Sequence, residues 1–340
     1  MTDQNGAPKG AGLAAIEKEM ARQGRDAAHS FASAREQAGA LAVAVRSTGR
    51  LLLLGMGASH AAGRIVEPLY RRLGIDAVAI PLSEQLTAPV PLADKTVIVT
   101  SQSGESAELI RWLDEVGKRD GVYGMTLEPR STLARAAPSL VGSGGAEVAF
   151  AATRSLMVTL ALHLAILAGL GEDPTPALQA LRSPAKPDLR EALDSLASAE
   201  AVVASGRLLQ GLAEAVALGI TELSRRPAFA LEGGQLRHGP PEMFGPKVGV
   251  VLLRSSEAGA SLVANSARLA LEAKCNVVIF DASGDLSIPG AANIRWPRSE
   301  GLAAVLTMLP TAQRLMLDFA ASRVADVGVP RLSSKVTRTE

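Results

Sequence analysis

The chain has 340 residues, 47% hydrophobic and 20% charged, a composition that predicts a folded protein with a sizeable core and, by its length, two domains. Its 35 Lys and Arg balance its 34 Asp and Glu, and aromatic residues make up only 3%, so neither charge nor base-stacking side chains favour a nucleic-acid partner. Cys275 is the only cysteine, which excludes an internal disulfide framework and a multi-cysteine metal site and indicates a reducing, cytoplasmic setting.

Residues 1–48 predict a helical amino-terminal arm. The polar opening MTDQNGAPKG lacks the basic and apolar plan of a signal peptide, so we expect none. From residue 49 to 172, short apolar runs alternate with amphipathic stretches, which is typical of right-handed βαβ units on a parallel sheet. The first domain is therefore predicted to be an open α/β structure. Its predicted strands are Leu51–Leu54, Asp76–Ile80, Thr96–Thr100 and Val122–Leu127.

Two polar turns follow predicted strands of this domain. The strand Thr96–Thr100 runs into SQSGES, where hydroxyl and amide donors surround a glycine that lets a ligand approach the backbone. A helix follows, and because its first N–H groups carry partial positive charge, we predict a phosphate site there. Capping of the helix by Ser103 is the structural alternative. The candidate ligands are Ser101, Gln102, Ser103 and Ser106, joined by Ser59 of the turn GMGAS, at the carboxyl end of a neighbouring strand where open sheets bind ligands.

The segment Ser155–Gly171 is uncharged and mostly apolar, so a membrane span has to be considered. The segment contains His163 and is shorter than the roughly 20 residues that a span needs. We therefore predict a buried helix. The next stretch, Glu172–Arg190, holds four prolines and breaks the apolar rhythm, which predicts a linker between two domains.

The pattern of the first domain restarts in residues 191–328, which predict a second domain. EAVVASG again combines an apolar run with a glycine, KVGVVLLRSSEAGAS parallels KTVIVTSQSGES, and NVVIF follows. We interpret this as an internal duplication of one α/β unit. The duplicated turn carries an extra carboxylate and lacks the glutamine, so we expect only the first turn to hold phosphate.

Two further segments have features of a site. His238 stands in LRHGPPEMFGP, where glycine and prolines restrict the backbone, as suits a positioned imidazole, although an ordinary turn would look the same. The tail VPRLSSKVTRTE, residues 329–340, could be a frayed terminus or an ordered strand that brings Lys335 over the site. Glu222, sixteen residues before His238, has no distinguishing pattern of its own.

Taken in order, GMGAS followed by AAG, SQSGES, a glutamate sixteen positions before HGP, and a terminal PRLSSKVT resemble the SIS (sugar isomerase) domain family. The layout is similar to the isomerase half of glutamine:fructose-6-phosphate amidotransferase and covers about residues 49–340. The resemblance implies two tandem doubly wound five-stranded parallel-sheet domains of flavodoxin-like type.

The resemblance also implies roles for individual residues. Ser101, Gln102, Ser103 and Ser106 match its phosphate-binding loop, and Ser59 matches a serine that contacts the sugar. Glu222 matches the carboxylate that moves a proton between two sugar carbons, and His238 matches a histidine that opens the ring and comes from a neighbouring subunit. Lys335 matches a lysine of the carboxyl-terminal loop. A homodimer acting on a hexose or hexosamine 6-phosphate is the implied assembly.

Three departures from the amidotransferase pattern qualify the implied chemistry. The only cysteine is Cys275 and the chain begins MTDQN, so we expect no glutaminase activity. Gly219 stands where the amidotransferase has a lysine ahead of Glu222. Arg154 stands at a position where the family often has a lysine.

We accordingly expect a phosphosugar isomerase, or a deaminase or deglycase of an amino-sugar phosphate, that works through an enediol or enolamine. The alternative is a sugar-phosphate sensor without catalytic activity. We expect no metal or cofactor, because the four histidines have no ligand spacing.

Overall fold

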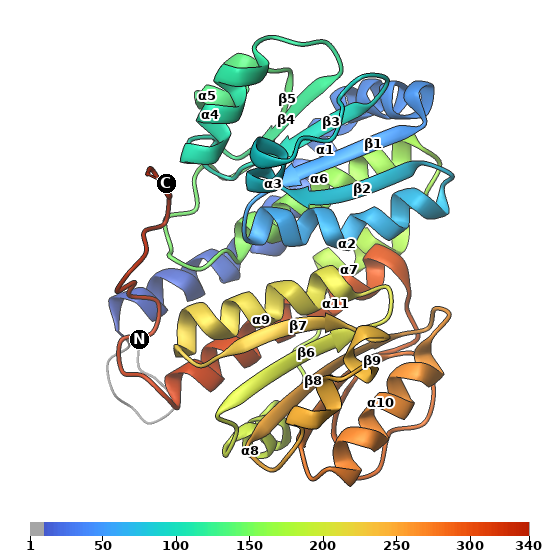
Figure 1. Ribbon diagram of the computed structural model, residues 1–340, viewed down its shortest axis with the longest axis vertical. Helices are drawn as coiled ribbons and strands as arrows, with labels where there is room; N and C mark the ends of the chain where they lie inside the picture. The colour runs from blue at the N-terminus through green and yellow to red at the C-terminus, as the bar shows by residue number, and fades with distance from the viewer. Residues whose placement is uncertain (1–9, 340) are drawn as a thin grey trace. The chain divides into compact units, whose positions relative to one another are not determined.

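Ten strands within the described residues, 10–339, form two five-stranded parallel sheets in a computed structural model of the protein (Figure 1). Each sheet belongs to its own unit of the chain. The first-sheet unit comprises residues 15–182 together with the tail from residue 330, and the second-sheet unit comprises residues 183–329 together with residues 10–14. The chain passes from one unit to the other between Arg182 and Ser183, inside the predicted linker.

The elements up to this crossing alternate strands and helices in chain order. They are α1 (Ala11–Thr48), β1 (Arg50–Gly55), α2 (Ala58–Arg72), β2 (Asp76–Pro81), α3 (Leu82–Thr87), β3 (Thr96–Thr100), α4 (Ala107–Val116), β4 (Val122–Thr126), α5 (Thr132–Ala136), β5 (Ser139–Val141), α6 (Arg154–Gly169) and α7 (Thr175–Arg182). Residues 1–9 of the predicted arm lie outside the described residues.

The elements after the crossing repeat the alternation and end in a long helix. They are α8 (Arg190–Leu196), β6 (Ala201–Gly206), α9 (Gln210–Ser224), β7 (Ala228–Glu232), the 3-10 turns η1 (Gln235–Arg237) and η2 (Pro240–Met243), β8 (Val248–Ser255), α10 (Ala260–Glu272), β9 (Asn276–Ala282), β10 (Ala292–Arg295) and α11 (Gly301–Ala321).

The first sheet has the strand order β2-β1-β3-β4-β5, with every pair parallel. From β1 the chain crosses to β2 on one side, and β3 then pairs on the other side of β1. The register sets Gly55 at the end of β1 opposite Thr100 at the end of β3. This is the point at which the direction of winding reverses, where loops diverge and open α/β sheets bind ligands.

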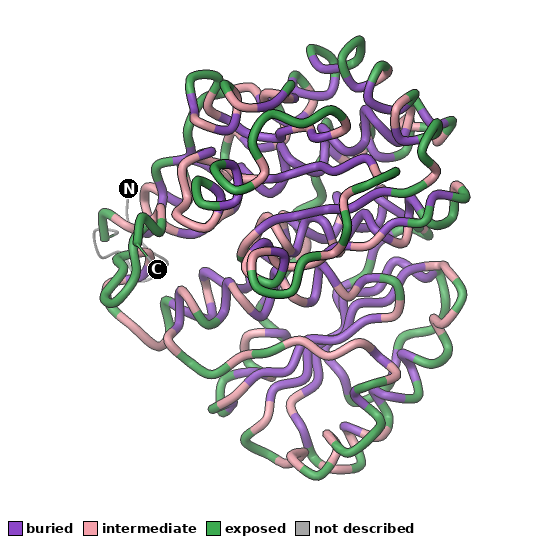
Figure 2. Tube along the Cα trace, turned by 45° about the horizontal axis from the view of Figure 1, so that its top comes forward, coloured by how far each residue is buried: buried purple, intermediate pink, exposed green. Residues whose placement is uncertain are grey.

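Both faces of the first sheet are covered, as its near-continuous apolar strands require (Figure 2). Leu52 and Leu54 pack with α4 and α5, whereas Leu53 on the opposite face approaches Gly63 of α2. Helix α6 is buried from Arg154 through Leu167. No helix among the described residues combines the length and the apolar character needed to cross a bilayer.

The second sheet has the order β10-β9-β8-β6-β7, which is the same winding when it is read from β7. Gly206 ends β6 opposite Leu253 of β8, as Gly55 ends β1 opposite Thr100. Its core includes Val250 and Leu252 of β8 packed with α10. The fold class is therefore two tandem doubly wound α/β domains, as predicted.

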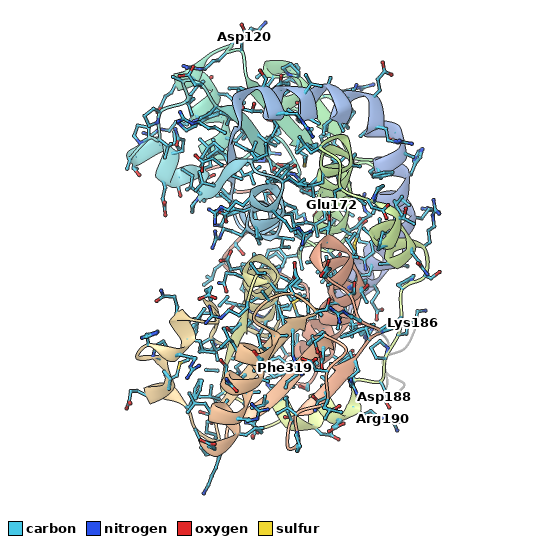
Figure 3. The ribbon with its side chains drawn as sticks, turned by 90° about the vertical axis from the view of Figure 1, so that its right-hand side faces the viewer. Asp120, Glu172, Lys186, Asp188, Arg190 and Phe319 are labelled. Carbon is cyan, nitrogen blue, oxygen red and sulfur yellow. The ribbon has the colours of Figure 1, made fainter. Side chains whose placement is uncertain are left out.

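Figure 3 labels Asp188 and Arg190, which follow the crossing between the two units, and Phe319 in the last helix. In the α7–α8 connection, the Asp188 carboxylate accepts a hydrogen bond from the Arg190 backbone N–H at 3.0 Å. In α11, Phe319 is buried and the Arg323 guanidinium lies 4.1 Å from its ring centre. Both contacts are local, so they stabilise the ends of helices.

Candidate active site

The loop SQSGES occupies the carboxyl end of β3, at the reversal point of the first sheet. Its backbone is held from β4: the Leu127 N–H and the Thr126 hydroxyl each lie 3.1 Å from the Gln102 carbonyl oxygen, and both donate to it. Helix α4 begins directly after the loop, at Ala107. The loop therefore combines several side-chain donors with the positive end of a ten-residue helix.

The serine hydroxyls of the loop are oriented by the backbone. Ser101 Oγ accepts from the Gly104 N–H at 3.1 Å, and Ser103 Oγ accepts from the Glu105 N–H at 3.2 Å. Because a hydroxyl has one donor hydrogen and two acceptor lone pairs, each of these groups can still donate to an anion. Ser106, and not Ser103, is the N-cap residue of α4, and its side chain makes no capping hydrogen bond. The capping alternative thus does not account for this run of polar residues.

Gly104 and Glu105 shape the other side of the loop. Gly104 has φ +65°, and a Cβ at this position would lie 2.3 Å from Ser131 Oγ, so the position requires glycine. The Glu105 carboxylate accepts from the Thr132 N–H at 2.6 Å and from the Thr132 hydroxyl at 3.0 Å. This negative charge is therefore paired with the start of α5.

Ser59 lies in the first turn of α2, after β1. Its N–H donates to the Met56 carbonyl at 3.0 Å. A Cβ at Gly55 would lie 2.8 Å from the Ser59 carbonyl carbon, so glycine allows α2 to begin tightly against the end of β1. Since β1 and β3 are neighbours in register, Ser59 and the loop follow adjacent strands at one edge of the sheet.

The carboxyl-terminal tail docks on the first-sheet unit. The Thr337 carbonyl accepts a hydrogen bond from the N–H of Ala107, the first residue of α4, at 3.0 Å. Two residues earlier, Lys335 Nζ lies 3.1 Å from Glu147 Oε2 and 3.4 Å from the Phe150 carbonyl oxygen. The tail thereby brings an ammonium group into the unit that carries the serine loop.

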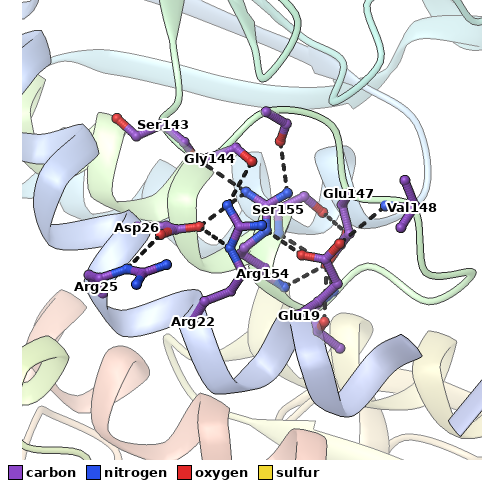
Figure 4. A network of polar contacts seen from close by, with 12 residues as sticks. Glu19, Arg22, Arg25, Asp26, Ser143, Gly144, Glu147, Val148, Arg154 and Ser155 are labelled. Carbon is purple, nitrogen blue, oxygen red and sulfur yellow. Dashed lines mark hydrogen bonds and ion pairs between the residues drawn. The ribbon is translucent and has the colours of Figure 1, made fainter. Parts of the chain in front are cut away.

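Glu147 is a buried carboxylate at the start of α6 (Figure 4). Its Oε1 accepts from the backbone N–H groups of Thr153 at 3.0 Å and Arg154 at 2.7 Å, and its Oε2 accepts from the Ser155 hydroxyl and from Lys335. Burial by itself raises the pKa of Glu147, but the Lys335 charge and the hydrogen bonds from Ser155 and Thr153 outweigh burial and lower it. Glu147 is therefore a fixed negative charge.

Arg154 holds the segment before Glu147 against α1 (Figure 4). Its guanidinium is fully buried, lies 2.6 Å from a Glu19 carboxylate oxygen, and donates to the carbonyls of Ser143 at 3.2 Å and Gly145 at 2.7 Å. Asp26 lies 3.6 Å from it. The arginine that departs from the family pattern is therefore a structural link between α1 and the β5–α6 connection.

Glu222 and His238 lie in the second-sheet unit. Glu222 is half-buried near the end of α9. His238 follows η1 with an exposed side chain, and its backbone N–H bonds to the Gln235 carbonyl at 3.1 Å. Gly219, one turn before Glu222, faces α11, where a Cβ would lie 2.4 Å from Met316 Sδ. Close helix packing thus accounts for glycine at the position of the expected lysine.

The duplicated turn after β8 is closed by its own charges. By register, Arg254 stands where Ser101 stands in the first sheet, and it is buried between Asp281 at 3.3 Å and Asp285 at 2.5 Å. The Ser255 hydroxyl donates to the Glu257 carboxylate at 2.7 Å. Glu257 is the extra carboxylate noted in the sequence, and it accepts the hydrogen bond that the Ser255 hydroxyl could otherwise donate to an anion.

The serine loop, Ser59 and Lys335 thus belong to one unit, whereas Glu222 and His238 belong to the other. Sequence reasoning missed Glu147, whose only signal was a lone acidic residue shortly before an apolar helix. Within residues 10–339, no group of three or more His, Cys, Asp or Glu side chains is arranged to hold a metal ion.

One protein-family model matches the part of the chain that forms the first sheet. Residues 45–168 match the SIS domain, and this span contains Ser59 and the whole serine loop. The chain therefore carries a SIS domain, and its second sheet repeats the same winding.

Among curated proteins, the chain is homologous to the glutamine–fructose-6-phosphate aminotransferase (isomerizing) of Aeropyrum pernix, with 28% identity over 351 residues. The alignment covers 95% of this chain and 57% of the relative, and the chain spans about half the length of the curated relatives that it matches.

Solved structures share the fold across both units. The C-terminal domain of glucosamine-fructose-6-phosphate aminotransferase from Francisella tularensis matches with a TM-score of 0.79 at 17% identity, covering 97% of this chain and all of that one. Tagatose-6-phosphate ketose/aldose isomerase from Escherichia coli gives 0.74 at 21% identity, covering 90% and 92% of the two chains. Glucosamine-6-phosphate deaminase from Thermotoga maritima gives 0.73 at 21% identity, covering 95% and 99%.

Proposed function

We propose that the protein is an enzyme that processes a phosphosugar, either by aldose–ketose isomerisation or by deamination or deglycation of a ketose or hexosamine 6-phosphate. The observation that carries the proposal is the loop 101–106, with oriented hydroxyls at the start of α4 and at the reversal point of the sheet. Such a site suits a phosphate dianion, which anchors the sugar and does not itself react.

The proposed chemistry is a proton transfer between adjacent carbons. The Glu222 carboxylate removes the hydrogen on the carbon beside a carbonyl or imine, which leaves an enediol or enolamine, and returns the proton to the neighbouring carbon. One base can serve both positions because the two carbons are bonded, and such transfer contributes about 10²–10⁴-fold to the rate. His238 would open the sugar ring, and Lys335 would interact with the open-chain substrate.

Three of the named relatives and fold neighbours point to this range of reactions. These proteins are an isomerizing aminotransferase, a ketose/aldose isomerase and a deaminase of a sugar 6-phosphate. Amino transfer from glutamine is the least supported, because Cys275 is buried in the core, where burial raises the pKa of its thiol, and Gly219 replaces the expected lysine.

The proposal includes a homodimer in which His238 serves the neighbouring subunit's site, in the cytoplasm. The exposed position of His238 on a turn is compatible with contact to another chain. An isolated monomer should then be inactive.

The test is solvent deuterium exchange into a panel of hexose and hexosamine 6-phosphates, followed by NMR with and without ammonium, together with measurement of free amine. We expect exchange at the carbon beside the carbonyl for one member of the panel. Glu222→Gln should lose this exchange while keeping affinity for the phosphosugar. Tight binding of a phosphosugar without exchange in the wild type would instead favour a sugar-phosphate sensor, and absence of binding would refute both.

A further inference from the structure

The tail ends in two specific contacts on the first-sheet unit. Lys335 Nζ reaches Oε2 of Glu147 at 3.1 Å, and the Thr337 carbonyl takes the N–H of Ala107 at 3.0 Å. The preceding residues 331–334 are exposed. Near its end, the tail is thus attached beside the serine loop by a side chain and by the backbone.

The carboxylate that receives Lys335 is itself rigidly placed. Its Oε1 is held by the first N–H groups of α6, and the segment on its amino-terminal side is held by Arg154, whose own partners lie on α1 (Figure 4). The Val148 N–H on its other side also lies 3.3 Å from a Glu19 oxygen. A carboxylate with this many fixed partners positions whatever cation pairs with its remaining lone pairs.

We propose that Glu147 is the positioning residue of the carboxyl-terminal tail: its buried carboxylate fixes Lys335, and with it the tail, against the first-sheet unit beside the 101–106 loop. For its link to catalysis, the inference rests on the proposed function. The docking itself does not depend on any reaction.

The burial of the pair makes this contact matter more than a surface ion pair. The Glu147 side chain has no exposed surface and Lys335 has 22%. Exposed ion pairs contribute little, whereas removing one partner of a buried pair leaves a desolvated charge without compensation. Losing either partner should therefore release the tail.

The experiment measures tail release by limited trypsin digestion with mass spectrometry, following cleavage after Arg331 and Arg338 in the full chain without any sugar. The variants are Glu147→Gln, Lys335→Met and the double variant. Gln keeps an oxygen that can accept from α6, so it removes the charge with the least damage to the helix start. We expect each single variant to raise the cleavage rate roughly tenfold and the double variant to add nothing further.

The matched control is Glu172→Gln, which removes another ion pair of the same unit, Arg72 to Glu172 at 3.0 Å, that does not involve the tail (Figure 3). It should leave cleavage unchanged. Unchanged cleavage in Lys335→Met would overturn the inference, as would additive effects of the two substitutions. If Glu147→Gln fails to fold, Lys335→Met still decides, since Lys335 lies outside the core.

A second measurement separates positioning from general stability and from the proposed function. If the protein is the proposed enzyme, Glu147→Gln should lower kcat roughly tenfold and change the Kd for inorganic phosphate much less, because the hydroxyl and amide groups of the serine loop remain in place. A wild type that shows no isomerase or deaminase activity would refute the proposed function, yet the digestion would still test the docking.

Discussion

A guanidinium nitrogen of Arg207 lies 3.3 Å from Oε1 of Glu232, at the entrance to the turn that carries His238. The second oxygen of Glu232 accepts from the backbone N–H groups of Gly234 at 2.6 Å and Gln235 at 3.2 Å. The carboxylate therefore caps η1 and is held in turn by the end of β6. His238 follows this turn directly, so its position depends on a pair of charges that sequence reasoning did not select.

Removing this cap should misplace His238. We expect Glu232→Ala to lower kcat about tenfold, which corresponds to roughly 1.4 kcal/mol, while affinity for phosphate is retained. Steady-state kinetics on the substrate found by the exchange panel measures this. Glu242→Ala, an exposed carboxylate of η2, is the control. Equal kcat in Glu232→Ala and the wild type would contradict the assigned role of the cap.

Two causes require glycine at position 104: its positive φ, and the clash that a Cβ would make with Ser131. A second glycine allows the two causes to be separated. Gly104 has φ +65° and a neighbour in the way of a Cβ, whereas Gly117 has φ +64° and nothing within 4 Å. We expect Gly117→Ala to cost about 1 kcal/mol and Gly104→Ala about 2–4 kcal/mol of unfolding free energy, the excess coming from the clash with Ser131.

Urea unfolding followed by Trp112 fluorescence in a Trp296→Phe background reports on the first-sheet unit, where Trp112 is buried in α4. Gly104→Ala should also weaken phosphate binding and Gly117→Ala should not. Equal costs for the two glycines would refute the contact with Ser131.

Ser106 in the loop and Ser131, the N-cap residue of α5, should have separable effects on phosphate binding and on stability. Ser106 makes no capping bond, whereas Ser131 Oγ accepts from the Ala134 N–H at 3.2 Å at the start of α5. Ser131→Ala should lower the unfolding free energy by about 1 kcal/mol with a small effect on phosphate affinity. Ser106→Ala should weaken phosphate binding with little change in stability. Calorimetry with inorganic phosphate and urea unfolding measure the two effects, and the reverse pattern would exclude Ser106 as a ligand.

The stability of the first-sheet unit should fall in mild acid because of His163. This histidine is fully buried in α6, its Nδ1 lies 3.0 Å from the Tyr70 hydroxyl, and burial lowers its pKa from 6.5 to about 3. Below pH 6.5 the unfolded chain binds a proton at this ring and the folded chain does not. The contribution of His163 therefore decreases by about 1.4 kcal/mol per pH unit from below pH 6.5 towards the folded pKa.

Urea titrations between pH 7 and pH 4.5, again with Trp112 as the reporter, measure this slope. His163→Gln should be less stable at pH 7 but should lose this part of the pH dependence. His29→Gln, at an exposed position of α1, should keep it. A slope that is the same in the wild type and in His163→Gln would show that other groups cause it.

The central strands could be predicted from sequence because they are buried on both faces. Apolar runs predicted β1, β3 and β9, and β3 begins and ends where predicted, at Thr96 and Thr100. The strands that sequence reasoning missed, β5, β7 and β10, lie at the edges of the sheets. β5 and β10 have only three and four residues. An edge strand also needs no continuous apolar run, since one of its sides has no neighbouring strand, although the edge strand β2 does have one.

Some residues of the candidate site could likewise be predicted from the sequence, and others could not. The serine loop could be recognised because hydroxyls clustered between a strand and a helix leave a local pattern in the sequence. Glu147 and Arg207 could not be recognised, because each acts through a distant partner. Glu147 pairs with Lys335, 188 residues away, and Arg207 pairs with Glu232 at the end of the next strand. Their roles depend on which segments the fold brings together.

By itself, the sequence determined the α/β class, the repeated strand–turn–helix pattern and the hydroxyl-rich loop before a helix, because alternating apolar runs and a polar turn before a helix are properties of neighbouring residues. Only the tertiary structure decided that the tail lysine pairs with a buried carboxylate, that Arg154 braces the segment beside it, and that the duplicated turn is closed by Asp281 and Glu257. Ion pairs and caps between distant segments are chosen by packing, since a charged side chain in a sequence does not specify its partner.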